Sequence, residues 1–173
     1  VGELVFNTSM TGYQEIITDP SYKKQIITFT HPHIGNTGIN QEDNESKVIH
    51  ASGMVFKNFC ENPSNWRSET SLEDFLVKND VMAISEVDTR QITSILRENG
   101  AMNCCIGSIS VISEEGAIKE AKSFKGLKGM DLAQVVSSAS EYEWNEGIWP
   151  ENKKSNESLP VVAYDYGIKE NIL

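Results

Sequence analysis

Residues 6–22 read FNTSMTGYQEIITDPSY, and they combine two turn-forming patches with almost no side chain able to act as an acid or a base. The first patch runs from Gly12 to Glu15, and the second is Asp19-Pro20-Ser21. Proline presets the backbone for a turn, and Asp and Ser side chains hydrogen-bond to nearby backbone groups. The segment therefore predicts two turns, and its composition leaves open what it does if it does not catalyse a reaction.

Length and charge restrict the class of protein. With 173 residues and 39% hydrophobic content, the chain can bury the core of one domain and carry an appendage. Its 15 basic and 25 acidic residues give a net charge of -10. Such a field repels phosphate backbones and anionic membranes. We expect neither nucleic acid nor membrane as a partner.

The cysteines and the apolar runs indicate the compartment. Cys60, Cys104 and Cys105 are an odd number with two adjacent, which is a poor disulfide framework. No apolar run reaches the roughly 18 residues needed to span a bilayer, and the N-terminus lacks the basic-then-apolar pattern of a signal peptide. The expected location is the reducing cytoplasm.

Short β-branched runs alternate with helical patterns, which predicts an α/β fold. The predicted strands are residues 4–8, 25–30, 48–59, 81–85 and 105–112. Helices are predicted after Ser71, Asp88 and Ser113, because each residue can cap a helix. Gly100 supplies a stop for the helix after Asp88. The stretch GLKGMD predicts a turn before a further helix start at Asp131.

Composition divides the chain into three segments. Residues 1–136 predict one domain whose beginning we expect to be cut, and residues 137–160 are polar, Gly- and Pro-punctuated and typical of a linker. Residues 161–173, VVAYDYGIKENIL, show an apolar run, a Gly turn and a possible helix start, as in the first βα unit of a parallel-sheet domain. One strand cannot make a core, so we expect a second domain to continue beyond Leu173.

Two groups of residues are candidates for chemistry, and each has a simpler interpretation. His31 and His33 in HPHIG would share one face of a strand and could ligate a metal with His50. Pro32 argues against a regular central strand, and structural or loop histidines are the alternative.

Cys104 or Cys105 could be a nucleophile if a histidine activated it. At a strand entry, however, cysteine usually behaves as a small buried apolar residue. The adjacent carboxylates Glu73-Asp74 and Glu114-Glu115 fall in the first turns of predicted helices, where they offset the helix dipole. No convincing catalytic constellation emerges from the residues alone.

Five motifs resemble one known family in their order and wording. They are GELVFNTSMTGYQEIITDPSY, QIITFTHPHIGNTGIN, VDTRQITSILRENGAMN, GLKGMDLAQVV and VVAYDYGIKENIL, and together they run from Gly2 to Leu173. They closely resemble the small, glutamine-hydrolysing subunit of carbamoyl phosphate synthetase.

The resemblance implies a fold and a reaction. It implies a swivelling β/β/α N-terminal domain joined to a class I glutamine amidotransferase domain that begins at about Val161. The Cys, His and Glu that hydrolyse glutamine would lie beyond Leu173. None of the three cysteines here matches that nucleophile, so we expect the chain alone to be inactive, with no catalytic residue of its own.

The resemblance also implies partners and cofactors. Ammonia released from L-glutamine would pass through an internal tunnel to a large subunit, which makes carbamoyl phosphate for arginine and pyrimidine synthesis. ATP and magnesium or manganese ions would bind to the large subunit. The resemblance implies neither a cofactor nor a metal on this chain.

One site residue follows from the motif DPSY. The resemblance implies that Ser21 contacts the glutamine substrate, and a hydroxyl suits this role because it can donate or accept a hydrogen bond without adding charge. The simpler interpretation is that Ser21 only caps its turn. The uncharged stretch around Met10 and Tyr13 is expected to meet the partner subunit, because few ions would be desolvated there.

Two other classes of function remain open from the residues. One is a non-catalytic module that docks onto a larger synthetase and helps to assemble it. The other is a self-contained cysteine hydrolase that uses Cys104 or Cys105.

Overall fold

The run QIITF forms β2 (Gln25–Phe29), the central strand of a five-stranded mixed sheet in the order β6-β4-β2-β1-β7. The computed structural model describes residues 1–147 and 159–173. Strands β1 (Gly2–Asn7), β4 (Gly53–Val55) and β6 (Ala83–Ile84) run parallel to β2. Strand β7 (Met102–Cys104) pairs antiparallel with β1. The predicted α/β class is confirmed.

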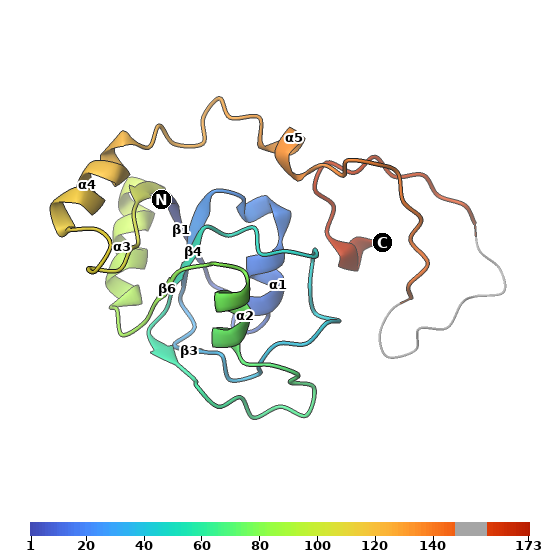
Figure 1. Cartoon of the computed structure of the whole chain (residues 1–173), viewed down its shortest axis with the longest axis horizontal. Helices are drawn as coiled ribbons and strands as arrows, with labels where there is room; N and C mark the ends of the chain where they lie inside the picture. The colour runs from blue at the N-terminus through green and yellow to red at the C-terminus, as the bar shows by residue number, and fades with distance from the viewer. Residues whose placement is uncertain (148–158) are drawn as a thin grey trace.

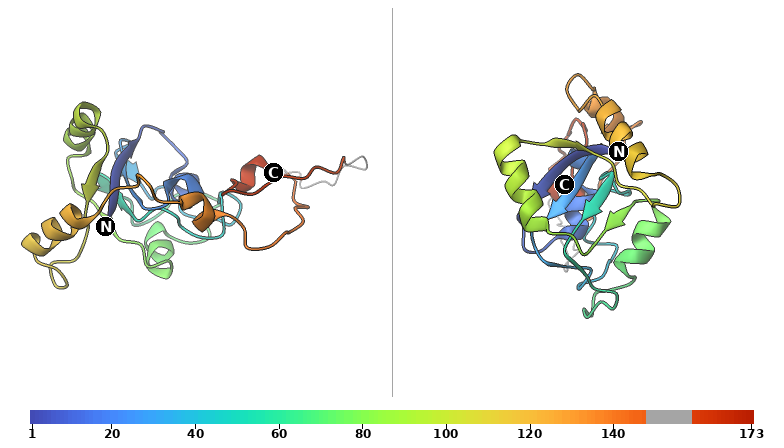
Figure 2. Two further views of the ribbon diagram at one scale, coloured as in Figure 1. Left: turned by 90° about the horizontal axis from the view of Figure 1, so that it is seen from above. Right: turned by 90° about the vertical axis from the view of Figure 1, so that its left-hand side faces the viewer.

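Helices cover both faces of this sheet (Figures 1 and 2). Figure 1 shows α1 (Tyr13–Thr18) and α2 (Leu72–Lys78) on one side and α3 (Thr89–Asn99) on the other. Side chains alternate along β2, so both of its faces are buried. The main core joins both helices of the first face to the sheet, through Ile17, Ile27, Phe29, Met54 and Leu72.

The predicted helix starts are confirmed because their signals are local. The carboxylate of Asp88 accepts a hydrogen bond from the backbone N–H of Gln91 at 2.9 Å. Ser71 caps α2, Ser113 caps α4 (Glu114–Ser123) and Asp131 caps α5 (Leu132–Val136) in the same way. Gly100 ends α3.

The strand prediction for residues 105–112 is wrong. Strand β7 ends at Cys104, and the backbone N–H groups of Val111 and Ile112 both donate to the carbonyl of Ser108 in a turn. The hydroxyls of Ser108 and Ser110 lie 2.8 Å apart and bond to each other. Such local hydrogen bonds compete with a strand ladder, and they outweigh the β-branched residues of the stretch.

The predicted strand at 48–59 is broken into shorter pieces. Residues 53–55 form β4, and β5 (Asn58–Phe59) pairs with β3 (His33–Ile34) in a separate two-stranded sheet.

Helix α1 was not expected in the turn-rich stretch of residues 6–22. It has six residues, and Gly12 precedes it with a left-handed φ of 79°. Tyr13 and Ile17, one helical turn apart, are both buried in the core. Packing of this face stabilises a helix too short to be stable alone.

The segments after α5 bear on the predicted boundaries. Residues 148–158 of the predicted linker lie outside the described residues, so this boundary stays a prediction. Residues 161–164 join no sheet in the described chain, and Val161 and Val162 are exposed. A parallel strand needs neighbours from its own sheet, so the expected amidotransferase strand also stays a prediction. Among the described residues, no helix combines the length and the apolar character needed to cross a bilayer.

His50 connects the loop before β4 to α1. Its backbone N–H donates to the carbonyl of Ile17 at 3.0 Å. Its imidazole is half-buried, and Nδ1 has no hydrogen-bond partner among the described residues. Burial lowers the pKa of His50 and Lys23 lowers it further, while Asp19 opposes them.

We expect Ile27→Ala to lower the free energy of unfolding by about 2–5 kcal/mol, because it leaves a cavity in the fully buried central strand. Urea unfolding would measure the loss. The control Val77→Ala removes a side chain that is 74% exposed, and it should change stability by no more than about 0.5 kcal/mol. Equal effects of the two substitutions would contradict this description of the core.

We expect stability to fall as the pH drops through about 6.5, because unfolded His50 binds a proton more tightly than folded His50 does. The change His50→Gln removes this titration and should reduce the loss of stability between pH 7.5 and pH 5.5. Urea unfolding at both pH values would measure it. An identical loss in the variant and the unaltered protein would contradict the prediction.

Candidate functional site

Ser21 lies on the turn between α1 and β2. The 3-10 helix η1 (Pro20–Tyr22) begins with a proline, whose fixed φ suits the first position. The carboxylate of Asp19 accepts a hydrogen bond from the backbone N–H of Ser21 through Oδ1 at 2.8 Å. The side chain of Ser21 is exposed. The predicted Asp-Pro-Ser turn is thus confirmed, and it holds Ser21 at the surface.

A segment from the other end of the chain packs against this turn. The ammonium of Lys169 lies 2.8 Å from Oδ2 of Asp19, whose side chain is only 8% exposed. The hydrogen bond to Asp19 raises the pKa of Lys169, although burial opposes it. Both oxygens of the Asp19 carboxylate are therefore satisfied, one within the turn and one across to Lys169.

Gly167 allows this close approach. Its φ of 94° is strained for other residues, and a Cβ atom there would lie 2.5 Å from the side chain of Val136 and 3.1 Å from that of Pro20. The carboxylate of Asp165 accepts hydrogen bonds from the N–H groups of Gly167 and Ile168 at 2.7 and 2.9 Å. Burial raises the pKa of Asp165, but these hydrogen bonds outweigh it and lower the pKa overall.

Three parts of the chain meet around a hollow of about 180 Å³ beside Ser21. The turn contributes Pro20, Ser21 and Lys23, and the late segment contributes Tyr166 and Gly167. Helix α5 supplies the apolar wall. A hydroxyl and an ammonium next to an apolar wall suit a small polar molecule that carries a carboxylate.

Ser21 is the predicted site residue, whereas Lys23, Tyr166 and Lys169 were not predicted. No local signal marks Tyr166 or Lys169, because Tyr166 lines the hollow with residues 20–23 and Lys169 pairs with Asp19, all distant in the sequence. The pairing of the buried Asp19 with Lys169, 150 positions later, appears only when the chain is folded.

The three histidines are not brought together as a metal site. The rings of His31 and His33 pack edge to face, with centroids 6.3 Å apart. His50 instead lies close enough to Lys23 and Asp19 for their charges to shift its pKa in opposite directions. Across residues 1–147 and 159–173, no group of three metal-ligating side chains is present. The alternative of structural or loop histidines fits these positions.

The Cys104 thiol does not have the surroundings of a nucleophile. Burial raises the pKa of the Cys104 thiol, and Cys105 raises it further. A raised pKa disfavours the thiolate that nucleophilic attack requires. This position speaks against a cysteine hydrolase that uses Cys104.

Of the two residues expected at a contact surface, the structure exposes Met10 and buries Tyr13. Met10 is 75% exposed, but Tyr13 is buried in the core and its hydroxyl donates to the carbonyl of Gly38 at 2.6 Å. Tyr13 is a core residue because it lies on the inner face of α1, a helix that the sequence did not reveal.

Comparisons with known proteins give one family, over residues 1–106 for the family profile and over the whole chain for individual relatives. The sequence profile of the family "Carbamoyl-phosphate synthase small chain, CPSase domain" matches residues 1–106. The carbamoyl phosphate synthase small chain of Photobacterium profundum is 55% identical over 181 residues, which cover all of this chain and 47% of that protein. The small chains of Vibrio cholerae and Thioalkalivibrio sulfidiphilus are 55% and 53% identical, with 48% and 47% of their lengths covered.

The chain spans about half the length of the curated relatives it matches. The profile covers the body from β1 to β7, and the identity continues through the segment that contacts Asp19. This chain belongs to the family of carbamoyl phosphate synthase small chains.

Proposed function

We propose that the whole protein is the glutamine-hydrolysing small chain of carbamoyl phosphate synthase. It would release ammonia from L-glutamine, and a large chain would use the ammonia with bicarbonate and ATP to make carbamoyl phosphate for arginine and pyrimidine synthesis. The identity of more than 50% to small chains along all 173 residues supports this proposal.

The present chain would contribute the domain that supports the catalytic half. We propose that its mixed α/β body is the swivelling β/β/α domain of the family, and that residues 161–173 open the amidotransferase domain. Gly167 packs tightly against Pro20 and Val136, which supports contact between the α/β body and the start of the amidotransferase domain at this point. We call this contact the joint. Residues 1–173 alone would not hydrolyse glutamine.

The proposed substrate contact is the hydroxyl of Ser21. The observation that carries it is the exposed Ser21 on a turn fixed by Asp19, at the edge of a hollow that residues 166–167 also line. The hydroxyl can bond to either polar group of an amino acid. Lys23 lines the same hollow, and its ammonium would suit the α-carboxylate of glutamine.

The remaining proposals concern partners and location. ATP and magnesium or manganese ions would bind to the large chain, and the two chains would form a heterodimer. Three unpaired thiols support a reducing compartment such as the cytoplasm.

We expect Ser21→Ala in the full-length small chain, assembled with its large chain, to raise KM for glutamine. Loss of one hydrogen bond to a polar or charged group costs about 0.5–3 kcal/mol, which is a factor of roughly 2 to 150. Steady-state kinetics would measure KM, with ammonia-driven synthesis as an internal check that should not change. The exposed Ser64→Ala is the matched control and should leave KM unchanged.

An unchanged KM in Ser21→Ala would mean that the Ser21 hydroxyl does not contact glutamine. A full-length protein that binds the large chain but releases no ammonia from glutamine would favour the alternative, a non-catalytic assembly module. The KM of Ser21→Ala tests the substrate contact, and ammonia release by the unaltered protein tests the enzymatic function. Either test can fail without the other.

A further inference from the structure

Glu45 contacts two parts of the chain that are distant in sequence. Its backbone N–H donates to the hydroxyl of Thr18, at the end of α1, at 2.9 Å. Its carbonyl accepts from the N–H of Glu170 at 2.9 Å, and its carboxylate accepts from the N–H of Asn171 at 3.3 Å. Glu45 thus bridges the end of α1 and the 3-10 helix η2 (Glu170–Ile172).

The carboxylate of Glu45 supplies a cap that η2 lacks within its own sequence. The residue before η2 is Lys169, whose side chain has no acceptor, and it makes no capping hydrogen bond. The first N–H groups of a helix need acceptors from elsewhere. Glu45 provides two of them, one from its backbone to Glu170 and one from its side chain to Asn171, which is 126 positions away.

Thr18 anchors the other end of this bridge. It is fully buried, and its hydroxyl donates to the carbonyl of Gln14 at 2.9 Å while accepting from Glu45. The hydroxyl of Ser46 donates to the carbonyl of Thr18 at 2.7 Å. The next residue, Asp19, holds both Ser21 and Lys169. The bridge therefore joins the body directly beside the turn that presents Ser21.

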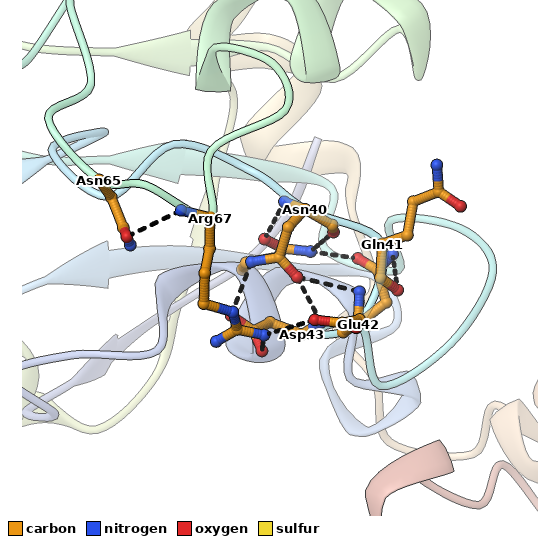
Figure 3. Close-up of polar contacts among 8 residues, drawn as sticks. Asn40, Gln41, Glu42, Asp43, Asn65 and Arg67 are labelled. Carbon is orange, nitrogen blue, oxygen red and sulfur yellow. Dashed lines mark hydrogen bonds and ion pairs between the residues drawn. The ribbon is translucent and has the colours of Figure 1, made fainter. Parts of the chain in front are cut away.

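The loop that carries Glu45 is itself fixed by a polar cluster (Figure 3). The side-chain oxygen of Asn40 accepts from the N–H groups of Glu42 and Asp43, each at 2.9 Å. Arg67 lies 2.7 Å from Asp43 and 3.1 Å from Glu42. The buried amide of Gln14 pairs with the backbone of Asn40 on the other side. These contacts hold the loop against α1 before it reaches Glu45.

We propose that Glu45 is a positioning residue that fixes residues 169–172 against the end of α1 and so sets the geometry of the hollow beside Ser21. This inference rests on the proposed role of Ser21 in glutamine binding. Lys169 and residues 170–171 are neighbours in one segment, so the Asp19–Lys169 ion pair and the hydrogen bonds of Glu45 to Glu170 and Asn171 form two parallel links. Two links restrain both the distance and the rotation of the segment, whereas one would restrain only the distance.

The test uses the full-length small chain assembled with its large chain. Glu45→Ala removes the side-chain acceptor, Glu45→Gln keeps one, and Ser46→Ala removes a second contact of the same loop with Thr18. The exposed Glu61→Ala is the matched control for charge. Amide hydrogen exchange of the peptide 166–173 reports on the joint, and KM for glutamine reports on the hollow.

We expect Glu45→Ala to speed exchange of peptide 166–173 about fivefold, the equivalent of one hydrogen bond. KM for glutamine should rise by a similar factor, while ammonia-driven synthesis stays unchanged. Glu45→Gln should restore both values to near those of the unaltered protein, and Ser46→Ala should shift them in the same direction as Glu45→Ala. Glu61→Ala should change neither.

Unchanged exchange in both Glu45→Ala and Ser46→Ala would overturn the proposal. Faster exchange with unchanged KM, in a protein where Ser21→Ala does raise KM, would also overturn it, because the joint would then not control the hollow. Faster exchange in a protein where Ser21→Ala has no effect supports the joint and instead contradicts the glutamine role of Ser21. These outcomes distinguish a failure of the positioning role of Glu45 from a failure of the glutamine contact of Ser21.

Discussion

The carboxylate of Asp19 is the constraint on which the site depends. A nearly buried charge costs several kcal/mol unless each of its oxygens is paired. One oxygen is paired locally by the N–H of Ser21, which determines the shape of the turn. The other is paired by Lys169, so the same residue that shapes the turn also requires the late segment to lie beside it.

The position of Ser21 in the sheet explains why that segment is needed. Open parallel sheets usually bind ligands at the edge where their strands end. Ser21 instead precedes β2, on the edge where the strand begins. This edge contributes Ser21 and Lys23 to the hollow but only part of its lining. The hollow takes its shape from α5 and from residues 166–167, which belong to a part of the chain that follows the body.

Local signals in the sequence predicted local structure, and distant contacts escaped prediction. The helix starts at Ser71, Asp88 and Ser113 depend on a side chain and a backbone group three residues apart, so they were predictable. Helix α1 depends on packing against the sheet, and residues 105–112 depend on serine hydroxyls that compete with a strand. Ser21 could be proposed from its motif, but Lys169 and Glu45 act through partners more than a hundred positions away.

The long separation between Glu45 and η2 has a consequence for the order of events during synthesis. At about 5–20 residues per second, the ribosome needs roughly 6 to 25 seconds to make the 126 positions between Glu45 and Asn171. By the end of that interval every strand of the sheet and helices α1 to α5 have been made. Asp19 therefore has no Lys169 to pair with while the strands and helices before it are being made. The hollow beside Ser21, which residues 166–167 help to line, can therefore be completed only after every strand of the sheet has been made.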